Sequence, residues 1–365
     1  MRLTTVTRAV GRTVAQDLPS LHPGAAPLLR AGATVTASLA ASLVARGYHA
    51  VWVDDALSAG VDPTEILPAH IRERAVAGVA KALTDAREAF GRNQPIGEAT
   101  VRHLREIVAL VTAHLVTQPD ATLVLADLAA ADAYTHTHSV NVCSLGLLIG
   151  REMFRRDGWT DWTGRQRYDR IDEMLTKLGV GLLLHDVGKI AIPSEILNKP
   201  GKLTADEWEL MRAHPTLGEQ MLDVDQLGPL VLSVVSEHHE RWDGAGYPRG
   251  LKDTRITQLA RIAAVADVYD AVCSARPYKD AAPAHVGVRI VLEGSGAAFD
   301  PDVVDVFRRV VFPHPVGSEF ELSDGRIGVV IDVNPQEPDS PTVRVAADDG
   351  SFEELVAEPR HVALT

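Results

Sequence analysis

The chain has 365 residues, of which 46% are hydrophobic and 23% are charged, and it carries a net charge of −13 at pH 7. This composition is that of an ordinary globular protein with two or three domains, and the acidic balance excludes a general binder of nucleic acid polymers, which would need a basic face. The most apolar segments are too short to span a bilayer and the N-terminal residues lack the apolar stretch of a secretory signal, so we expect a cytoplasmic protein without a membrane span.

Residues 1–120 are expected to form an N-terminal accessory or regulatory region. A helical pattern that stops at Gly47 precedes a short strand at 50–53, and together they indicate a small α/β unit. Apolar residues then recur at helical spacing over 67–90 and 99–116. These two connecting helices are expected to lead into the next domain or to pack on it.

Residues 121–312 show an almost entirely helical pattern, which predicts an all-α bundle as the central domain. Near its end, Asp300 and Pro301 suit the N-cap and the first position of a helix. Cys143 and Cys273 lie in apolar helical patterns, so we expect packed thiols of a reducing compartment rather than a disulfide.

Residues 313–365 have a different character and predict a small antiparallel, barrel-like β module. Two runs of alternating polarity flank a turn at Asp324 and Gly325, and a second such pair follows. This segment has eleven acidic and three basic residues, which accounts for −8 of the net charge of −13, so a small anion can still bind elsewhere. The expected fold class is multidomain and mainly α, with a small mixed α/β N-terminal region and a β C-terminal module.

Five histidines and two aspartates stand out as candidate metal ligands. His185 and Asp186 end the strongly apolar run 178–184, where burial of an unpaired carboxylate is costly and a cation is the simplest compensation. Another aspartate, Asp267, lies in a second apolar helical pattern, within residues 262–280. The full set is His138, His185, Asp186, His214, His238, His239 and Asp267.

Every member of this set, taken singly, has a simpler interpretation as a hydrogen-bonded core residue, and Asp267 could pair with Arg261. Taken together, seven such residues exceed the needs of one ion with an open site, which takes about three protein ligands. They suit two ions, with Asp186 bridging them. His136 is expected to point away from His138 and is left out of the set.

Five stretches of the chain resemble, in order and spacing, the motifs of one known family. They are LLHDVGKIAIP, LNKPGKLT, HPTLG, HHERWDGAGYP and ADVYDAVCSARPYKD, and the likeness covers about residues 122–311, roughly half of the chain. The family is the HD-GYP branch of the HD metal-dependent phosphohydrolases, whose members cleave the bacterial messenger cyclic di-GMP. The His-Asp pair alone would be a weak signal, but the pair together with Gly-Tyr-Pro is a specific one.

The resemblance implies a role for each matching residue. The seven candidate ligands match the metal ligands of the family and would hold two divalent ions, with iron or manganese favoured and zinc as the alternative. Lys189 and Asp186 match catalytic positions, with Lys189 stabilising or protonating the leaving ribose oxygen. The residues assigned to substrate binding are Arg276, Lys279, Gly246, Tyr247, Pro248, Tyr134 and Asp270.

One position departs from part of the family. Members with a third metal ion carry a glutamate one helical turn before the first histidine, where this chain has Tyr134, four residues before His138. A neutral phenol, with a pKa of about 10, is a poor ligand. We therefore expect two ions, with the ring of Tyr134 lining the pocket.

The implied function is hydrolysis of cyclic di-GMP to linear pGpG, and a second cut would give GMP. Two alternatives stay open. One is a phosphohydrolase for another cyclic dinucleotide or a nucleotide, and the other is a sensor that binds the messenger without turnover. The terminal modules would bind protein partners that the sequence does not identify, and a homodimer is also open.

Overall fold

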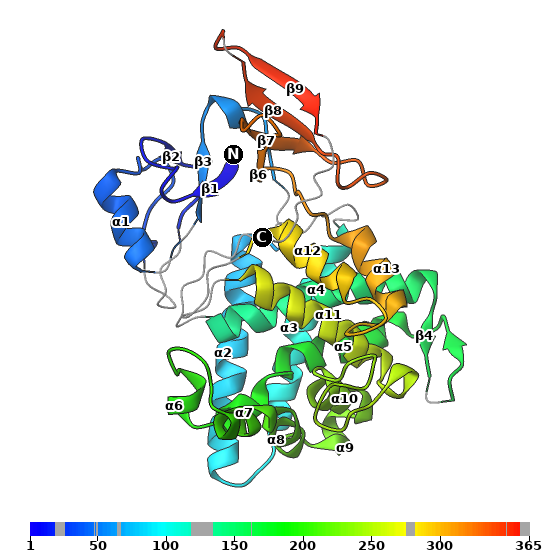
Figure 1. Cartoon of the computed structure of the whole chain (residues 1–365). Coiled ribbons are helices and arrows are strands. Elements are labelled where there is room, and N and C mark those ends of the chain that lie inside the picture. The colour runs from blue at the N-terminus through cyan, green and yellow to red at the C-terminus, as the bar shows by residue number, and fades with distance from the viewer. Residues whose placement is uncertain are drawn as a thin grey trace.

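The structure is a computed structural model, and it describes residues 1–18, 26–46, 48, 50–63, 67–117, 134–161, 163–274, 282–347 and 349–357. Within these ranges, none of the helices has both the length and the apolar character that crossing a membrane requires. The chain forms a large helical unit, with two small sheets at one end of it (Figure 1). The expected fold class, mainly α with small β modules at both ends, is confirmed.

The helical unit consists mainly of α-helices. Its helices are α2 (Ala69–Gly91), α3 (Glu98–Thr117), α4 (Tyr134–Arg156), α5 (Ile171–Leu184), α6 (Ser194–Leu197), α7 (Ala205–Arg212), α8 (His214–Gln220), α9 (Val224–Leu227), α10 (Pro229–Glu237), α11 (Gln258–Cys273), α12 (Ala284–Glu293) and α13 (Pro301–Val310). Two 3-10 turns, η2 (Val187–Ala191) and η3 (Asp253–Arg255), and a hairpin of β4 (Trp159–Thr160) and β5 (Gln166–Arg167) complete it.

One continuous hydrophobic core holds these helices together, and it runs from Leu67 to Val311. Within it, α4 packs against both α5 and α11, and α10 packs against both α5 and α8. Cys143 on α4 and Cys273 on α11 are packed, buried thiols, as expected. These contacts bring the polar ends of several helices close to one another.

Helix starts in this unit follow capping rules. The side chain of Asp300 accepts the N–H of Asp302 at 2.9 Å, and Pro301 is the first residue of α13, which confirms the predicted cap. At the start of α7, Thr204 and Glu207 bind each other's backbone N–H groups in a capping box. The caps fix where α7 and α13 begin.

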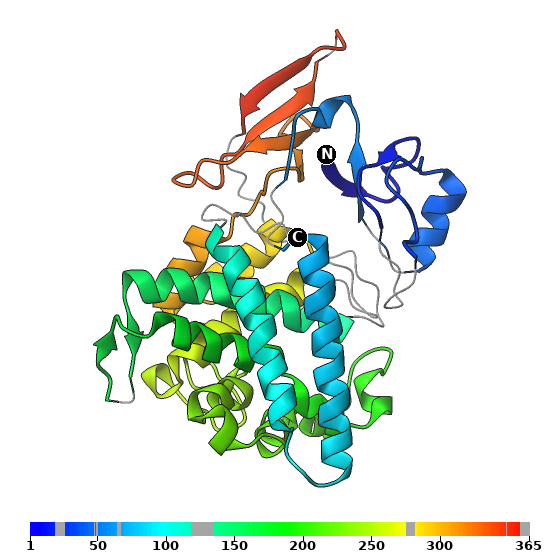
Figure 2. The ribbon, with the colours of Figure 1, turned by 180° about the vertical axis from the view of Figure 1, so that it is seen from behind.

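The predicted division at residues 120 and 121 assigns α2 and α3 to the N-terminal region. In the structure their apolar faces pack on α4 and α5, because the hydrophobic core already begins at Leu67. Figure 2 shows the two helices side by side along the helical unit. Packing on the next domain was one of the two arrangements expected for them.

The N-terminal residues form a three-stranded antiparallel sheet with one helix. Its elements are β1 (Arg2–Thr5), β2 (Thr13–Val14), α1 (Ala37–Ala45), β3 (Ala50–Asp54) and the 3-10 turn η1 (Ala56–Ser58). The sheet order is β1-β3-β2, with Arg2 opposite Val53. The predicted helix and strand correspond to α1 and β3, and the predicted stop at Gly47 lies outside the described residues.

The C-terminal residues form a four-stranded antiparallel sheet in the order β6-β7-β8-β9. The strands are β6 (Glu319–Glu321), β7 (Ile327–Asp332), β8 (Thr342–Ala346) and β9 (Phe352–Val356). Gly325, with a φ of 87°, lies in the predicted turn between β6 and β7. In the part of the chain that the structure describes, β6 and β9 are outer strands, so the expected barrel-like closure is not seen there.

The two small sheets pack against each other, although they come from opposite ends of the chain. Arg2 is buried and forms ion pairs with both Asp55, at 2.8 Å, and Glu319. The N–H of Leu3 donates to the carbonyl of Gly317 at 2.8 Å. The two sheets therefore form one composite terminal unit, which comprises the described residues of 1–63 and 315–357 (Figures 1 and 2).

Candidate metal centre

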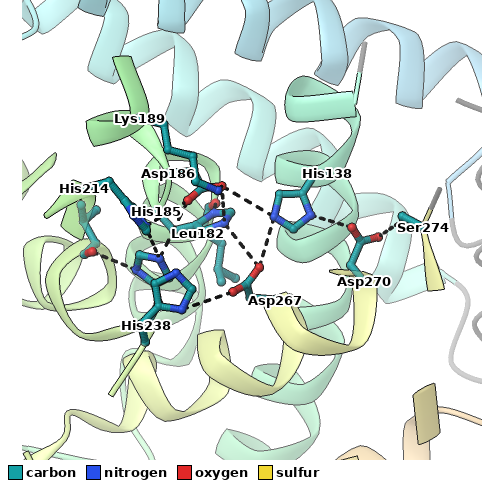
Figure 3. A network of polar contacts seen from close by, with 12 residues as sticks. His138, Leu182, His185, Asp186, Lys189, His214, His238, Asp267, Asp270 and Ser274 are labelled. Carbon is teal, nitrogen blue, oxygen red and sulfur yellow. Dashed lines mark hydrogen bonds and ion pairs between the residues drawn. The ribbon is translucent and has the colours of Figure 1, made fainter. Parts of the chain in front are cut away.

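All seven predicted metal ligands lie together in the helical unit. His138 lies near the start of α4, His185 and Asp186 follow α5, and Asp267 lies in α11. The other three are His214, which begins α8, and His238 and His239, which follow α10. Six of the seven side chains are buried, and that of His239 is partly exposed (Figure 3).

The seven residues contain two groups of three that could each hold a metal ion. Within each group, the donor atoms all lie within 4.8 Å of one another. We call His138, His185 and Asp186 the first ligand group, and His214, His238 and His239 the second ligand group.

Asp186 belongs to the first ligand group, but its carboxylate also faces the second ligand group. Its Oδ1 is 3.3 Å from His214 Nε2, while its Oδ2 is 3.8 Å from His138 Nε2 and 3.5 Å from His185 Nε2. Lys189 Nζ donates to Oδ2 at 2.6 Å. One carboxylate oxygen for each group is the arrangement that a bridging ligand requires.

Asp267 is the second carboxylate that spans the groups. Its Oδ1 is 3.2 Å from His138 Nε2, and its Oδ2 is 3.8 Å from His239 Nδ1. The alternative partner considered from the sequence, Arg261, pairs with Asp300 instead. Asp267 is therefore directed at the two groups and not at a neighbouring cation.

Three histidines are oriented by backbone carbonyls in the same way. In His185, His214 and His238, Nδ1 faces the carbonyl oxygen of the residue three positions earlier. Because a carbonyl only accepts, each Nδ1 carries the proton and each Nε2 is left with a lone pair directed into the centre. The carbonyls belong to Leu182, Met211 and Val235, at 2.7, 2.8 and 2.9 Å.

His138 is oriented by a carboxylate instead. Its Nδ1 lies 2.6 Å from Oδ2 of Asp270, a fully buried residue whose Oδ1 accepts hydrogen bonds from Asn141 and Ser274, each at 3.0 Å. Asp270 was predicted to bind substrate. This prediction needs correction, because the carboxylate lies behind His138, on the far side from Asp186, and is enclosed by protein (Figure 3).

His136, which was left out of the ligand set, lies two residues before His138 on α4. Burial and the positive charge of Arg87 on α2 lower its pKa. Its imidazole is thus close enough to α2 to be affected by the charge of Arg87.

Two buried atoms of the centre lack a hydrogen-bond partner among the described residues. They are His185 Nε2 and Asp186 Oδ1, which belong to the first ligand group. Buried polar atoms in proteins are normally satisfied, and an unpaired one costs about 1–3 kcal/mol. A divalent cation at each ligand group would satisfy these two atoms, His185 Nε2 at the first group and Asp186 Oδ1 at the second.

The protonation of the centre also fits a metal site. Burial lowers the pKa of His214 to about 4, that of His239 to about 3, and that of His238 well below its usual value, so all three are neutral at pH 7. Burial would raise the pKa of Asp186, but Lys189 and the imidazoles lower it well below its usual value. Neutral imidazoles and ionised carboxylates are the forms that bind metal.

His138 differs from the other histidines. Burial disfavours its charged form, but hydrogen bonds to Asp267 and Asp270 outweigh this and raise its pKa to about 9. The proton on His138 Nε2 faces Asp267 Oδ1 at 3.2 Å, on the side of the ring where a metal ion would bind. These residues fit divalent metal, because a cation can replace this proton.

The Gly-Tyr-Pro turn packs directly on the second ligand group. The Tyr247 ring lies 4.8 Å from the His239 ring between centroids, and the Tyr247 N–H donates to the His239 carbonyl at 3.2 Å. A Cβ on Gly246 would lie 2.3 Å from the backbone nitrogen of Arg241, so only glycine fits. The expected tight backbone is present, but what it approaches is the chain's own residues 239–241. The Tyr247–Pro248 peptide bond is cis.

Two glutamates that the sequence reasoning missed anchor this turn. Glu240 is buried, and its carboxylate accepts the N–H groups of Arg249 and Leu251 at 2.7 and 2.9 Å. Glu237, also buried, accepts the N–H of Thr257 at 2.9 Å and binds the Arg249 guanidinium at 2.6 Å. The signal in the sequence was their position on either side of the histidine pair.

Three of the predicted site residues cannot be located in this way. Arg276 and Lys279 lie outside the described residues. Tyr134 is the first residue of α4, but its side chain is also outside them. The two substrate contacts and the pocket-lining phenol therefore remain predictions.

Comparisons with known proteins agree with this geometry. A family model described as an HD domain matches residues 165–303. The chain is 40% identical, over 273 aligned residues, to the cyclic di-GMP phosphodiesterase PA4108 of Pseudomonas aeruginosa. The aligned region covers 74% of this chain and 60% of that protein. It is also 33% identical, over 184 residues, to the 3′3′-cGAMP-specific phosphodiesterase 3 of Vibrio cholerae, covering 50% of this chain and 36% of that protein.

A solved structure shares the fold. It is Bd1817, an HDG"Y"P protein from Bdellovibrio bacteriovorus, with a TM-score of 0.50 and 15% identity over 84% of this chain and 97% of that one. The chain spans less than two thirds of the length of the two curated relatives.

The helical core gathers buried histidines and aspartates around one carboxylate, and the segment that holds most of them matches the HD model. These two features define an HD-domain protein. The Gly-Tyr-Pro motif of residues 246–248 packs on the second ligand group, and this motif is typical of one branch of the HD-domain proteins. Residues 165–303 match the HD-domain model, and the motifs of this segment resemble those of the HD-GYP family.

Proposed function

We propose that the chain is a metal-dependent phosphodiesterase that hydrolyses cyclic di-GMP to linear pGpG, with GMP as the product of a second cut. The observation that carries the proposal is the position of Asp186, whose two oxygens face two separate groups of buried donors. A relative that is 40% identical and is named a cyclic di-GMP phosphodiesterase supports the substrate.

The cofactor in this proposal is a pair of divalent ions, one at each ligand group, with Asp186 bridging and Asp267 as a further ligand. Iron or manganese suits a site of imidazoles and carboxylates, and zinc is the alternative. When bound, such ions supply Lewis-acid stabilisation of the phosphoryl group and lower the pKa of water. We expect two ions and not three, because Tyr134 stands where a third-ion ligand would be needed.

The chain's own residues perform the remaining work. The carbonyls behind His185, His214 and His238, and the carboxylate of Asp270 behind His138, hold the imidazoles in one tautomer and one orientation. Preorganised donors of this kind do not need to rearrange during the reaction.

Lys189 is the proposed proton donor. Its ammonium group binds Asp186 at 2.6 Å and its side chain is 30% exposed, so a substrate oxygen can reach it from solvent. From this position it can stabilise or protonate the leaving ribose 3′-oxygen, a role worth about a hundredfold or more in rate. Arg276 and Lys279 are proposed to neutralise the phosphates, and residues 246–248 to form the pocket rim.

The second candidate substrate is 3′3′-cGAMP, which a relative at 33% identity is named for. A sensor without turnover is the remaining alternative. It has less support, since all seven donors of the centre are present. Protein partners would bind the composite terminal unit, and a homodimer stays a proposal without further support.

The test is anaerobic purification followed by metal analysis and by chromatography of the products from cyclic di-GMP and 3′3′-cGAMP. The proposal requires pGpG or GMP from cyclic di-GMP at a higher kcat/KM than for 3′3′-cGAMP. Faster cleavage of 3′3′-cGAMP would reassign the substrate, and tight binding without cleavage by the metal-loaded protein would indicate a sensor.

A further inference from the structure

A row of three planar groups leads from the second ligand group toward the surface. The His239 ring lies 4.8 Å from the Tyr247 ring, and on this ring the guanidinium of Arg212 lies at 4.9 Å from the centroid. Arg212 is the last residue of α7, two positions before His214. The row therefore connects two ligands of one group through the Gly-Tyr-Pro motif.

Arg212 is held in place by this ring and has little else to bind. Among the residues that the structure describes, its other ion pair is with Glu209, at 3.3 Å, one turn earlier in α7 and 72% exposed. An ion pair that is exposed in this way contributes about 0–1 kcal/mol. The Arg212 side chain is itself 36% exposed, so its N–H groups are open to a ligand arriving from solvent.

The charge of Arg212 matters because the centre beside it is rich in carboxylates. Asp186 and Asp267 lie at this centre, and Lys189 already binds Asp186 at 2.6 Å. A phosphate that lies outside the reach of the metal ions needs a cation of its own. A guanidinium fixed on an aromatic ring presents a fork of donors that suits phosphate oxygens.

We propose that Arg212 is a specificity-determining residue that binds the phosphate of the cyclic dinucleotide that is not being cleaved. This inference rests on the proposed function. A cyclic dinucleotide has two phosphodiesters, and while one is at the metal centre the other lies across the ring. Arg212, one aromatic ring beyond the ligand His239, lies on the outward side where that second phosphate would be.

The test compares Arg212→Met, Arg212→Lys and the matched control Arg167→Met. Methionine keeps an apolar chain of similar length over Tyr247 but removes the charge, while lysine keeps the charge without the planar fork. Arg167 is likewise exposed and paired with a neighbouring acid, but it lies on β5. Cyclic di-GMP turnover, the metal content and the unfolding temperature are measured for each variant.

We expect Arg212→Met to raise the KM for cyclic di-GMP by about ten- to a hundredfold, the range for loss of a charged hydrogen bond, with kcat reduced less than threefold. The metal content stays unchanged, and Arg212→Lys gives an intermediate KM. With bis(p-nitrophenyl) phosphate, which has a single phosphate, the effect on KM is smaller.

A KM for Arg212→Met equal to that of the wild type would overturn the inference, and so would an equal rise of KM for both substrates, which would indicate that Arg212 only supports the turn. In both cases the wild type still cleaves cyclic di-GMP. If the wild type cleaves only bis(p-nitrophenyl) phosphate, it is the proposed function that fails, and the assignment of Arg212 fails with it.

Discussion

Asp270→Asn is expected to weaken metal binding and to leave substrate affinity nearly unchanged. The carboxylate of Asp270 accepts a hydrogen bond from His138 Nδ1–H on Oδ2. Its Oδ1 accepts hydrogen bonds from the side chains of Asn141 and Ser274. An amide at this position has one acceptor oxygen only. Its NH2 group must face either His138 or the other two donors, so at least one hydrogen bond is lost.

The magnitude follows from the position behind the ligand. Carboxylates that orient a metal-binding imidazole typically contribute ten- to a hundredfold to metal affinity. This corresponds to about 1.4–2.7 kcal/mol. The upper part of this range is expected for Asp270, because it is fully buried and makes a hydrogen bond of 2.6 Å to His138.

The assay is competition for Mn²⁺ or Zn²⁺ between the protein and a chelating dye, combined with steady-state turnover at saturating metal. Asp305→Asn is the control, since Asp305 lies on α13 and pairs with the arginines Arg156 and Arg309 at the surface. The control should keep the metal affinity of the wild type within about twofold.

Two results would refute this reasoning. One is an unchanged metal affinity in a folded Asp270→Asn protein. The other is a raised KM for cyclic di-GMP at full metal occupancy, which would restore the substrate contact predicted from the sequence.

Three further predictions concern pH, the composite terminal unit and the substrate phosphates. The pKa of His138 is about 9, so below this pH a proton on its ring competes with metal. The apparent metal affinity should therefore rise about tenfold per pH unit from pH 7 to 9. A metal affinity that does not change with pH in the dye-competition assay would contradict this protonation. Arg2→Met leaves the carboxylates of Asp55 and Glu319 without their buried partner and should lower the stability of the composite terminal unit by about 3–5 kcal/mol in calorimetry. Arg8→Met removes an exposed partner of Glu319 and should cost at most about 1 kcal/mol. Equal losses of stability in the two variants would refute the role of burial. Arg276→Ala and Lys279→Ala should raise KM with metal retained, and loss of metal from either variant would show that the role assigned to it is wrong.

The ligand set could be predicted because its members break local patterns. His185 and Asp186 end an apolar run, and His238 and His239 are adjacent, so each raises the question of what satisfies a buried polar group. The structure brings these residues together: His185 Nε2 lies 3.5 Å from Asp186 Oδ2, His238 Nε2 lies 4.0 Å from Asp186 Oδ1, and the His238 and His239 rings are 4.1 Å apart between centroids.

An aspartate that binds metal could not be told from one that orients a ligand, because both lie in the same apolar helical pattern. Asp267 and Asp270 lie one helical turn apart on α11, and both face α4. Which of them faces the donors and which lies behind His138 depends on the rotation of α11 against α4. Helical spacing alone does not fix this rotation.

Contacts between distant segments were beyond the sequence for a similar reason. Arg2 and Glu319 are at opposite ends of the chain, and no periodic pattern records that an arginine of β1 has its partner on β6. The carboxylates of Glu237 and Glu240 likewise depend on the path of residues 241–257, which returns to them only in three dimensions. Alternation of polarity predicts strands well, but not which sheet packs on which.

The central claim is that two ions are held around Asp186 and that they are needed for cleavage of cyclic di-GMP. The most direct test measures metal content and turnover on the same anaerobically purified sample, for the wild type and for Asp186→Ala. The wild type should contain about two ions per chain and produce pGpG, while Asp186→Ala keeps its helical circular dichroism but loses both ions and all turnover. Normal turnover by a well-folded Asp186→Ala protein, or a reproducible ratio near one or near three ions in the active wild type, would contradict the claim.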